Sequence, residues 1–177
     1  MLDWDLREKA VERKLDMKEK TEENLGTCAN AVETELPVKE MIHQAFEAMA
    51  KAYTPYSGFK VGAALLSADG TLYQGCNIEN AAYTPSNCAE RTAFFKAVSQ
   101  GVREFKAICI VGGKEGIPAG ITAPCGVCRQ VMMEFCEPET FKIILAEGKE
   151  EYKIFTLKEL LPMGFGPENL CKEADCS

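Results

Sequence analysis

Apolar residues recur at helical spacing from residue 38 to residue 53, and this pattern predicts an amphipathic helix. The positions that share one face of the helix are Val38, Met41, Ile42, Ala45, Phe46, Met49 and Tyr53. Pro55 follows the pattern and ends it, because proline cannot continue a helix. We therefore predict that the folded domain begins at Pro37 with this helix.

Shorter apolar runs that are rich in β-branched and aromatic residues predict five strands. They cover residues 60–66, 72–78, 105–111, 141–146 and 152–155. Two further helices are predicted over residues 88–101 and 125–136. Thr156, with Glu159 three residues later, has the capping-box pattern of a short final helix. This order of elements predicts an α/β fold in which helices pack on a mixed sheet.

The first 36 residues differ from the rest, because they are dense in charge and carry no sustained hydrophobic stripe. Acidic and basic residues stand four positions apart here, as Asp3 and Arg7 do, and such pairs favour a helix. We predict a charged N-terminal extension, either a helical arm or a disordered leader.

The charge and the cysteine content narrow the classes of partner and compartment. A net charge of −7 argues against non-specific binding to nucleic acid or to an anionic membrane, since both require a basic face. No apolar run approaches the ~20 residues of a spanning helix, and no secretory segment is evident. Nine cysteines without such a segment indicate reduced thiols. We therefore expect a cytoplasmic protein with no nucleic-acid and no membrane partner.

Two cysteine motifs carry the chemistry. Cys88 is followed by Glu90 two residues later, and Cys125 and Cys128 form a pair directly after Pro124. Catalytic zinc sites use three protein ligands and keep a fourth position for water. A nearby glutamate is suited to move that water's proton. Both motifs fall where helices are predicted to begin, and a helix N-terminus favours the thiolate form of cysteine.

The two arginines beside these cysteines have different predicted roles. Three thiolates on a divalent ion leave a net negative charge, which weakens the acidification of bound water. Arg91 lies three residues after Cys88, on the same helical face, and is placed to donate hydrogen bonds to sulfur. Arg129 follows Cys128 directly, and we expect it either at the surface or beside the ligands.

Two other interpretations of the cysteines remain open from the residues alone. Cys125 and Cys128 have the spacing of a dithiol redox motif. A structural zinc site would need a fourth ligand, and the cysteines available for that role are Cys76, Cys109 and Cys136.

At these motifs the chain resembles the cytidine deaminases of the short, all-cysteine type. The stretches that carry the resemblance are residues 55–65, 75–83, 87–93 and 124–130. The resemblance implies a three-layer α/β fold, with a mixed five-stranded sheet flanked by helices. It also implies a deaminase domain over residues 37–170, between the extension 1–36 and a tail at 171–177. In that family zinc would be held by Cys88, Cys125 and Cys128, with Glu90 as the catalytic residue.

The resemblance also implies a nucleoside substrate. Asn77 and Glu79 end a predicted strand two residues apart, and an amide and a carboxylate together can donate to and accept from a sugar hydroxyl. The matching positions in the family assign them to the ribose 3′-hydroxyl. Phe59 and Ala89 match nucleoside contacts. Phe165 matches a residue that reaches the base in a neighbouring subunit's site, which implies a homotetramer with shared active sites.

The expected reaction is the zinc-dependent hydrolytic deamination of cytidine and deoxycytidine to uridine and deoxyuridine plus ammonia, in pyrimidine salvage. An alternative is that the same active site deaminates another aminated nucleoside or a nucleoside-like antibiotic. Editing of RNA or DNA is disfavoured by the acidic balance of the chain.

Overall fold

The computed structural model describes residues 36–118 and 120–170 of the 177-residue chain. All but the last residue of the predicted extension, and the whole of the predicted tail, lie outside the described residues. The division of the chain into extension, domain and tail therefore stays a prediction. Within the described part, no helix combines the length and the apolar character needed to cross a bilayer.

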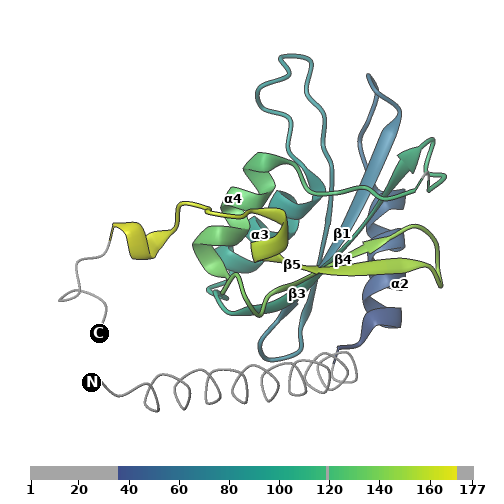
Figure 1. The fold of residues 1–177 in the computed structure, drawn as a ribbon. Coiled ribbons are helices and arrows are strands. Elements are labelled where there is room, and N and C mark those ends of the chain that lie inside the picture. Colours follow the sequence, from purple (N-terminus) through teal and green to yellow (C-terminus); the bar gives the residue numbers. More distant parts are fainter. Residues whose placement is uncertain (1–35, 119, 171–177) are drawn as a thin grey trace, which may run out of the picture. The chain divides into compact units, whose positions relative to one another are not determined.

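A mixed five-stranded sheet forms the centre of the domain (Figure 1). The strands are ordered β2-β1-β3-β4-β5. Only β3 and β4 pair in parallel, and the other neighbours are antiparallel. The bounds are β1 Phe59–Ser67, β2 Leu72–Cys76, β3 Phe105–Lys114, β4 Lys142–Ala146 and β5 Tyr152–Thr156. The α/β prediction with a mixed five-stranded sheet is confirmed.

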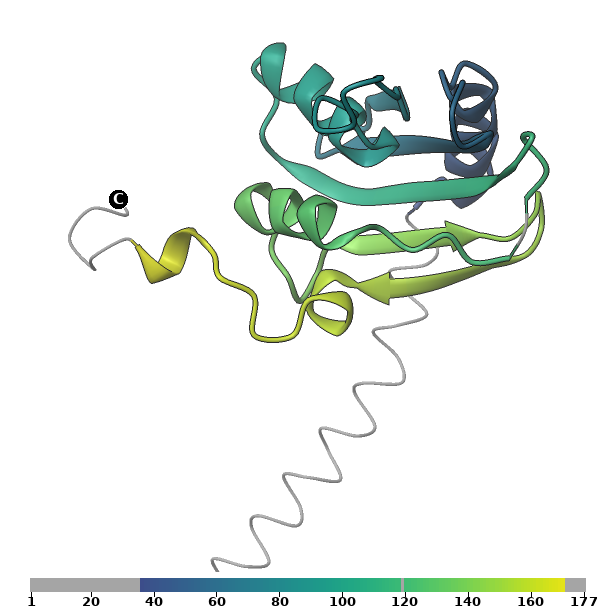
Figure 2. The ribbon, with the colours of Figure 1, turned by 90° about the horizontal axis from the view of Figure 1, so that it is seen from above.

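Helices cover both faces of this sheet (Figures 1 and 2). Along β1, Gly62 faces one helix of the first face, whereas Ala63 and Leu65 belong to the core cluster on the opposite face. The helices are α2 Val38–Ala50 on the first face, α3 Ala89–Ser99, α4 Gly126–Phe135 and α5 Leu157–Leu160 on the second, and the 3-10 turn η1 Pro167–Asn169. The short α5 begins with the predicted capping box of Thr156 and Glu159.

Two glycines let the helices approach the sheet closely. A Cβ atom at Gly62 would lie 2.0 Å from the carbonyl oxygen of Ala45 in α2. A Cβ atom at Gly75 would lie 2.3 Å from the carbonyl oxygen of Ala89, the first residue of α3. No side chain fits at either distance. The start of α3, and with it Cys88, is therefore seated directly against β2.

An aromatic cluster joins α3 to the rest of the second face. The ring of Phe94 in α3 lies 5.0 Å from the ring of Phe105, 6.1 Å from Phe135 at the end of α4, and 6.2 Å from Phe141, measured between centroids. Phe94 and Phe141 are almost fully buried. Because this cluster contacts both helices, it helps hold α3 beside α4.

Several predicted element bounds differ from the structure, and tertiary pairing explains three of these differences. The first helix ends at Ala50 rather than Tyr53, because Tyr53 forms a parallel bridge with Ile78. The second strand ends at Cys76, since Ile78 pairs with Asn87 as well. The third strand continues to Lys114, where it still pairs with β1.

Candidate active site

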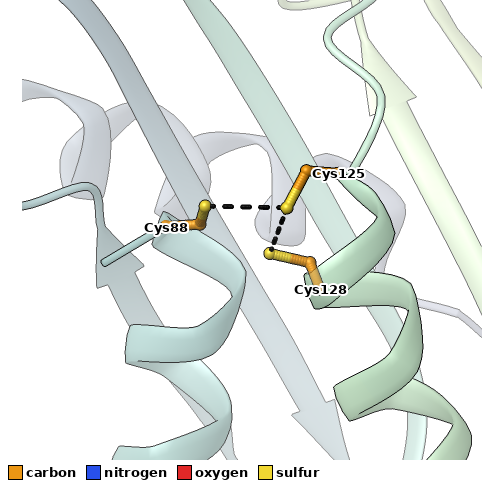
Figure 3. Close-up of side chains that lie close together, drawn as sticks. All are labelled: Cys88, Cys125 and Cys128. Carbon is orange, nitrogen blue, oxygen red and sulfur yellow. Dashed lines mark hydrogen bonds between the residues drawn. The ribbon is translucent and has the colours of Figure 1, made fainter. Parts of the chain in front are cut away.

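The three predicted ligands lie together at the start of two helices (Figure 3). Cys88 is the N-cap of α3, Cys125 is the N-cap of α4, and Cys128 lies in the first turn of α4. Their sulfur atoms lie within 4.8 Å of one another. The Sγ atoms of Cys88 and Cys125 are 3.8 Å apart, and those of Cys125 and Cys128 are 3.4 Å apart.

These distances fit a tetrahedral metal ion. Zinc–sulfur bonds of about 2.3 Å place two sulfurs of a tetrahedral site about 3.8 Å apart. Cys88 is half-buried, Cys125 exposed and Cys128 buried. The thiol cluster thus has a closed side and an accessible side, as a site with one exchangeable position requires.

The other described cysteines do not join the cluster. The one group of metal-ligating side chains found among the described residues contains these three cysteines alone. Cys76 and Cys109 pair across the sheet with Gly62 and Ala64, on the face that α2 covers, and Cys136 is the C-cap of α4, at the end opposite Cys125. Their positions argue against a structural zinc site completed by a fourth cysteine.

The pKa values of two thiols in the cluster, Cys88 and Cys128, are shifted in opposite directions. The pKa of the Cys88 thiol is lowered to about 5, first by its interaction with Cys128 and then by Arg91. The same interaction raises the pKa of Cys128, and burial adds to this effect. Cys88 therefore loses its proton more readily than Cys128, which would give up its proton when a metal competes for the sulfur.

Glu90 lies in the first turn of α3 with only 5% of its surface exposed. Burial raises the pKa of its carboxyl group to about 7, and the negative charge of Cys88 acts in the same direction. A carboxyl group that titrates near neutral pH can both accept and release a proton during turnover. This is the property that a proton shuttle beside the cluster needs.

Arg91 lies against the thiolate. Its Nη2 atom is 3.5 Å from the Sγ atom of Cys88 and 3.4 Å from the carbonyl oxygen of Ser86, and both are acceptors. The guanidinium group therefore places positive charge beside the sulfur. It offsets part of the negative charge that three thiolates would bring to a divalent ion.

A pocket of about 460 Å³ opens beside the cluster, and Cys88 is part of its wall. Asn77 and Glu79 line the same pocket. The remaining lining residues are Tyr56, Ser57, Ile78, Asn80, Tyr83, Ser86 and Asn87. The structure thus brings one predicted metal ligand and both predicted sugar-binding residues to a single cavity.

Glu79 is held by the turn that precedes β1. Its carboxylate accepts hydrogen bonds from the backbone N–H of Tyr56 at 2.9 Å and of Ser57 at 3.2 Å, and from the Ser57 hydroxyl. The Ser57 hydroxyl and the Tyr56 N–H together lower the pKa of Glu79. Glu79 is therefore an oriented carboxylate with acceptor capacity left for a ligand.

Asn77 is tied to β1 in a similar way. Its Oδ1 atom accepts from the N–H of Val61 at 2.8 Å, and its Nδ2 atom donates to the carbonyl oxygen of Phe59 at 2.9 Å. One amide hydrogen of Nδ2 remains for a ligand in the pocket. The side chain thus fixes the strand end and keeps one donor.

Comparisons with known proteins agree with this site. The sequence profile described as "Cytidine and deoxycytidylate deaminase zinc-binding region" matches residues 37–144. A protein named cytidine deaminase from Sporosarcina psychrophila is 49% identical over 140 residues, which are 79% of this chain and 99% of that protein.

Solved structures give the same result. The crystal structure of cytidine deaminase from Burkholderia pseudomallei superposes with a TM-score of 0.65 at 47% identity, over 71% of this chain and 97% of that one. Cytidine deaminase from Mycobacterium tuberculosis gives a TM-score of 0.64 at 35% identity, over 75% and 99% of the two chains. This chain belongs to the cytidine deaminase family. The predicted resemblance is confirmed, and the chain is a deaminase-type enzyme.

Three other residues were assigned by resemblance to the cytidine deaminase family, and they are not among the residues that line the pocket: Phe59, Ala89 and Phe165. Ala89 follows Cys88 and is fully buried. Phe59 begins β1, is 39% exposed and does not line the pocket. Phe165 lies beyond α5 and is 57% exposed, and its carbonyl oxygen accepts a hydrogen bond from Gln130. Their roles in the family reaction stay predictions.

The sequence interpretation did not predict the contacts of two residues that the structure connects with the site: it assigned no role to Ser57, and it expected Arg129 either at the surface or beside the ligands. Ser57 belongs to the turn that holds Glu79, and a serine before a glycine is an ordinary turn residue in sequence. Arg129 donates to the backbone carbonyls of Pro124, five residues before it, and of Leu160 at the end of α5. The only available signal for either residue was its place inside a stretch that resembles cytidine deaminases.

Proposed function

We propose that this enzyme catalyses the zinc-dependent hydrolytic deamination of cytidine and deoxycytidine, giving uridine and deoxyuridine plus ammonia, in pyrimidine salvage. The observation that supports this most directly is the three-thiol cluster with buried Glu90 beside it, at the wall of a pocket that Asn77 and Glu79 also line.

Cys88, Cys125 and Cys128 would hold the zinc ion. When bound, a zinc ion with one open position supplies a water of lowered pKa. The thiolate at Cys88, stabilised by Arg91, gives the site its first anionic ligand. Binding then releases the proton that Cys128 retains, so metal affinity should rise with pH.

Glu90 would move the protons of the reaction. It takes one proton from water and delivers it to N3 of the cytosine ring, while the water oxygen adds to C4. It then passes the second proton of water to the amino group at C4. The C4–N bond breaks, ammonia leaves, and the ring becomes uracil, so the atoms of substrate and water balance those of uridine and ammonia.

Asn77 and Glu79 would hold the sugar. The free amide hydrogen of Asn77 donates to the 3′-hydroxyl, and the oriented carboxylate of Glu79 accepts from it. Phe59 and Ala89 would complete the nucleoside contacts. These contacts require a free sugar end, which favours a nucleoside over a nucleic-acid strand.

We also propose a cytoplasmic homotetramer with shared active sites, in which Phe165 contacts the base in a neighbouring subunit. The exposure of Phe165 and of Met163, which is fully exposed, supports an apolar contact between copies. Sedimentation of the purified protein would test this assembly, and a monomer would contradict it. The domain division at residues 36/37 and 170/171 belongs to the same proposal.

The decisive experiment mixes the purified, zinc-loaded enzyme with cytidine and follows the ultraviolet change from cytidine to uridine. Deoxycytidine should react as well, and 3′-deoxycytidine should react poorly. A protein that contains zinc but leaves cytidine unchanged would contradict the substrate. Reaction with another aminated nucleoside under those conditions would favour the alternative substrate.

A further inference from the structure

Arg129 connects the metal-ligand turn with the segment that carries Phe165. We infer that Arg129 is a positioning residue for the deaminase site: its guanidinium fixes both the Pro124–Cys125 peptide and the backbone that follows α5. This inference deepens the proposed function and rests on it for the identity of the reaction. It rests on geometry alone for the effect on the metal site.

The first contact of Arg129 reaches the ligand turn. Its Nε atom donates to the carbonyl oxygen of Pro124 at 2.8 Å. Pro124 is buried and directly precedes Cys125, the exposed ligand of the cluster. The hydrogen bond therefore fixes the peptide plane from which the Cys125 side chain projects. Without it, the peptide that carries the most exposed of the three thiols would lose this restraint on its orientation.

The second contact reaches the end of α5. The Nη1 atom of Arg129 donates to the carbonyl oxygen of Leu160, the last residue of that helix. The same guanidinium thus serves two carbonyls from segments 36 residues apart in the chain. Guanidinium has several donors in a rigid planar fork, whereas the lysine ammonium is a point charge on a flexible stem. Only arginine at this position can hold both carbonyls in one fixed geometry.

Gln130 supplies a neighbouring and separable contact. Its Nε2 atom donates to the carbonyl oxygen of Phe165 at 2.8 Å. Consecutive residues of α4 therefore hold both ends of the segment from Leu160 to Phe165. Gln130 holds Phe165 alone, whereas Arg129 holds the start of the segment and the ligand turn. Substitutions at the two positions should then separate an effect on substrate from an effect on metal.

The experiment compares four variants: Arg129→Gln, Arg129→Lys, Gln130→Met and, as a control, Arg103→Gln at an exposed arginine outside the site. Each is loaded with zinc or cobalt. Three quantities are measured: the rate of metal loss to a chelator, the sulfur-to-cobalt absorption bands, and kcat and KM for cytidine. The first two need no turnover, so they test Arg129 even if cytidine is not the substrate.

Arg129→Gln should lose metal about 10- to 100-fold faster than the parent, the usual effect of removing a group that orients a metal ligand. Its cobalt bands should shift, and its KM should rise. Arg129→Lys should fall between parent and Arg129→Gln in metal loss. Gln130→Met should raise KM about fivefold, the loss of one hydrogen bond, with metal loss and cobalt bands unchanged. Arg103→Gln should match the parent.

Parental metal loss and parental cobalt bands in Arg129→Gln would overturn the inference. If Arg129→Gln does not fold, Arg129→Lys decides alone: faster metal loss with shifted bands supports the inference, and parental values overturn it. Equal effects of Gln130→Met and Arg129→Gln on metal loss would also overturn it, because they would indicate general loosening of the segment. Failure of cytidine to react, with these metal results intact, would refute the substrate and leave the positioning role standing.

Discussion

The metal side and the sugar side of the pocket are built in opposite ways. On the metal side, the three thiols contact mainly one another and Arg91. On the sugar side, Asn77 and Glu79 are already hydrogen-bonded to the backbone near the start of β1. Under the proposed function, the metal side keeps its ligand groups for the ion, whereas the sugar side uses the same atoms for folding and for binding.

This difference has an energetic consequence. If the thiols hold zinc as proposed, removing the Cys125 thiol should abolish metal binding and leave the surrounding fold largely intact. The Cys125 side chain is exposed, and among the described residues its sulfur contacts only the other two thiols of the cluster. Removing Asn77 or Glu79 also leaves backbone donors without their partners. Substitutions of Asn77 or Glu79 should therefore lower the stability of the fold as well as the affinity for the nucleoside. The four predictions below test this contrast between the metal side and the sugar side.

The largest effect is expected from Cys125→Ser. A serine hydroxyl is a poor ligand for zinc, so metal content and deamination should both fall below detection, while the melting temperature without metal stays near the parental value. Metal analysis and the ultraviolet assay check this. Cys76→Ser, on the opposite face of the sheet, is the matched control and should keep both metal and activity. Full zinc in Cys125→Ser would refute the ligand assignment.

Glu90→Gln should lower kcat by about 10²–10⁴-fold, the usual contribution of a positioned acid–base group, and should keep its zinc. The amide has the size of the carboxyl group but cannot accept and release the proton. Steady-state kinetics with parallel metal analysis measure both quantities. Glu134→Gln, an exposed glutamate on α4, should change neither, and near-parental kcat in Glu90→Gln would remove Glu90 from the mechanism.

The third prediction concerns stability in the metal-free protein. The pKa of Glu90 is raised from 4.5 to about 7 in the folded state. Below pH 4.5 the carboxyl group is therefore neutral in the folded and the unfolded protein, and its burial does not lower the free energy of unfolding. Between pH 4.5 and about 7 the carboxyl group ionises in the unfolded state but stays protonated in the folded state, so the free energy of unfolding falls as pH rises. Above about pH 7 it ionises in both states, and the loss levels off. The loss should approach about 3 kcal/mol above pH 7.

Denaturant unfolding of parent and Glu90→Gln between pH 4.5 and 8 measures this loss. The variant lacks the titrating group, so its advantage in the free energy of unfolding should grow from pH 4.5 to about pH 7 and then level off. Both proteins keep Cys88, and its titration cancels from their difference to first order. A pH-independent difference would show that burial of Glu90 does not govern its ionisation.

The smallest effects are expected on the sugar side. Glu79→Gln should lower kcat/KM for cytidine about 10- to 100-fold, as expected for losing a charged hydrogen bond. Ser57→Ala should cost only about two- to tenfold, since one neutral-donor contact to Glu79 is lost. Both should retain zinc, and both should melt below the parent. Parental melting temperatures would contradict the idea that this wall serves folding as well as binding.

The chemistry of the metal side was readable from the sequence because its motifs are local. Cys125 and Cys128 are one helical turn apart, and Glu90 and Arg91 are fixed relative to Cys88 by the helix that begins there. The sugar side was readable only through resemblance. The contacts of Glu79 come from Tyr56 and Ser57, more than 20 residues away, and no local pattern predicts that pairing.

The sequence by itself determined the order of helices and strands and the kinds of group available for catalysis, since periodicity and motif spacing act over a few residues. Only the tertiary structure decided which cysteines meet. Cys76, Cys109 and Cys136 are excluded by sheet face and helix end, which depend on packing between distant segments. The same holds for the double contact of Arg129: its acceptors, Pro124 and Leu160, come together only when α4 and α5 pack on the finished sheet.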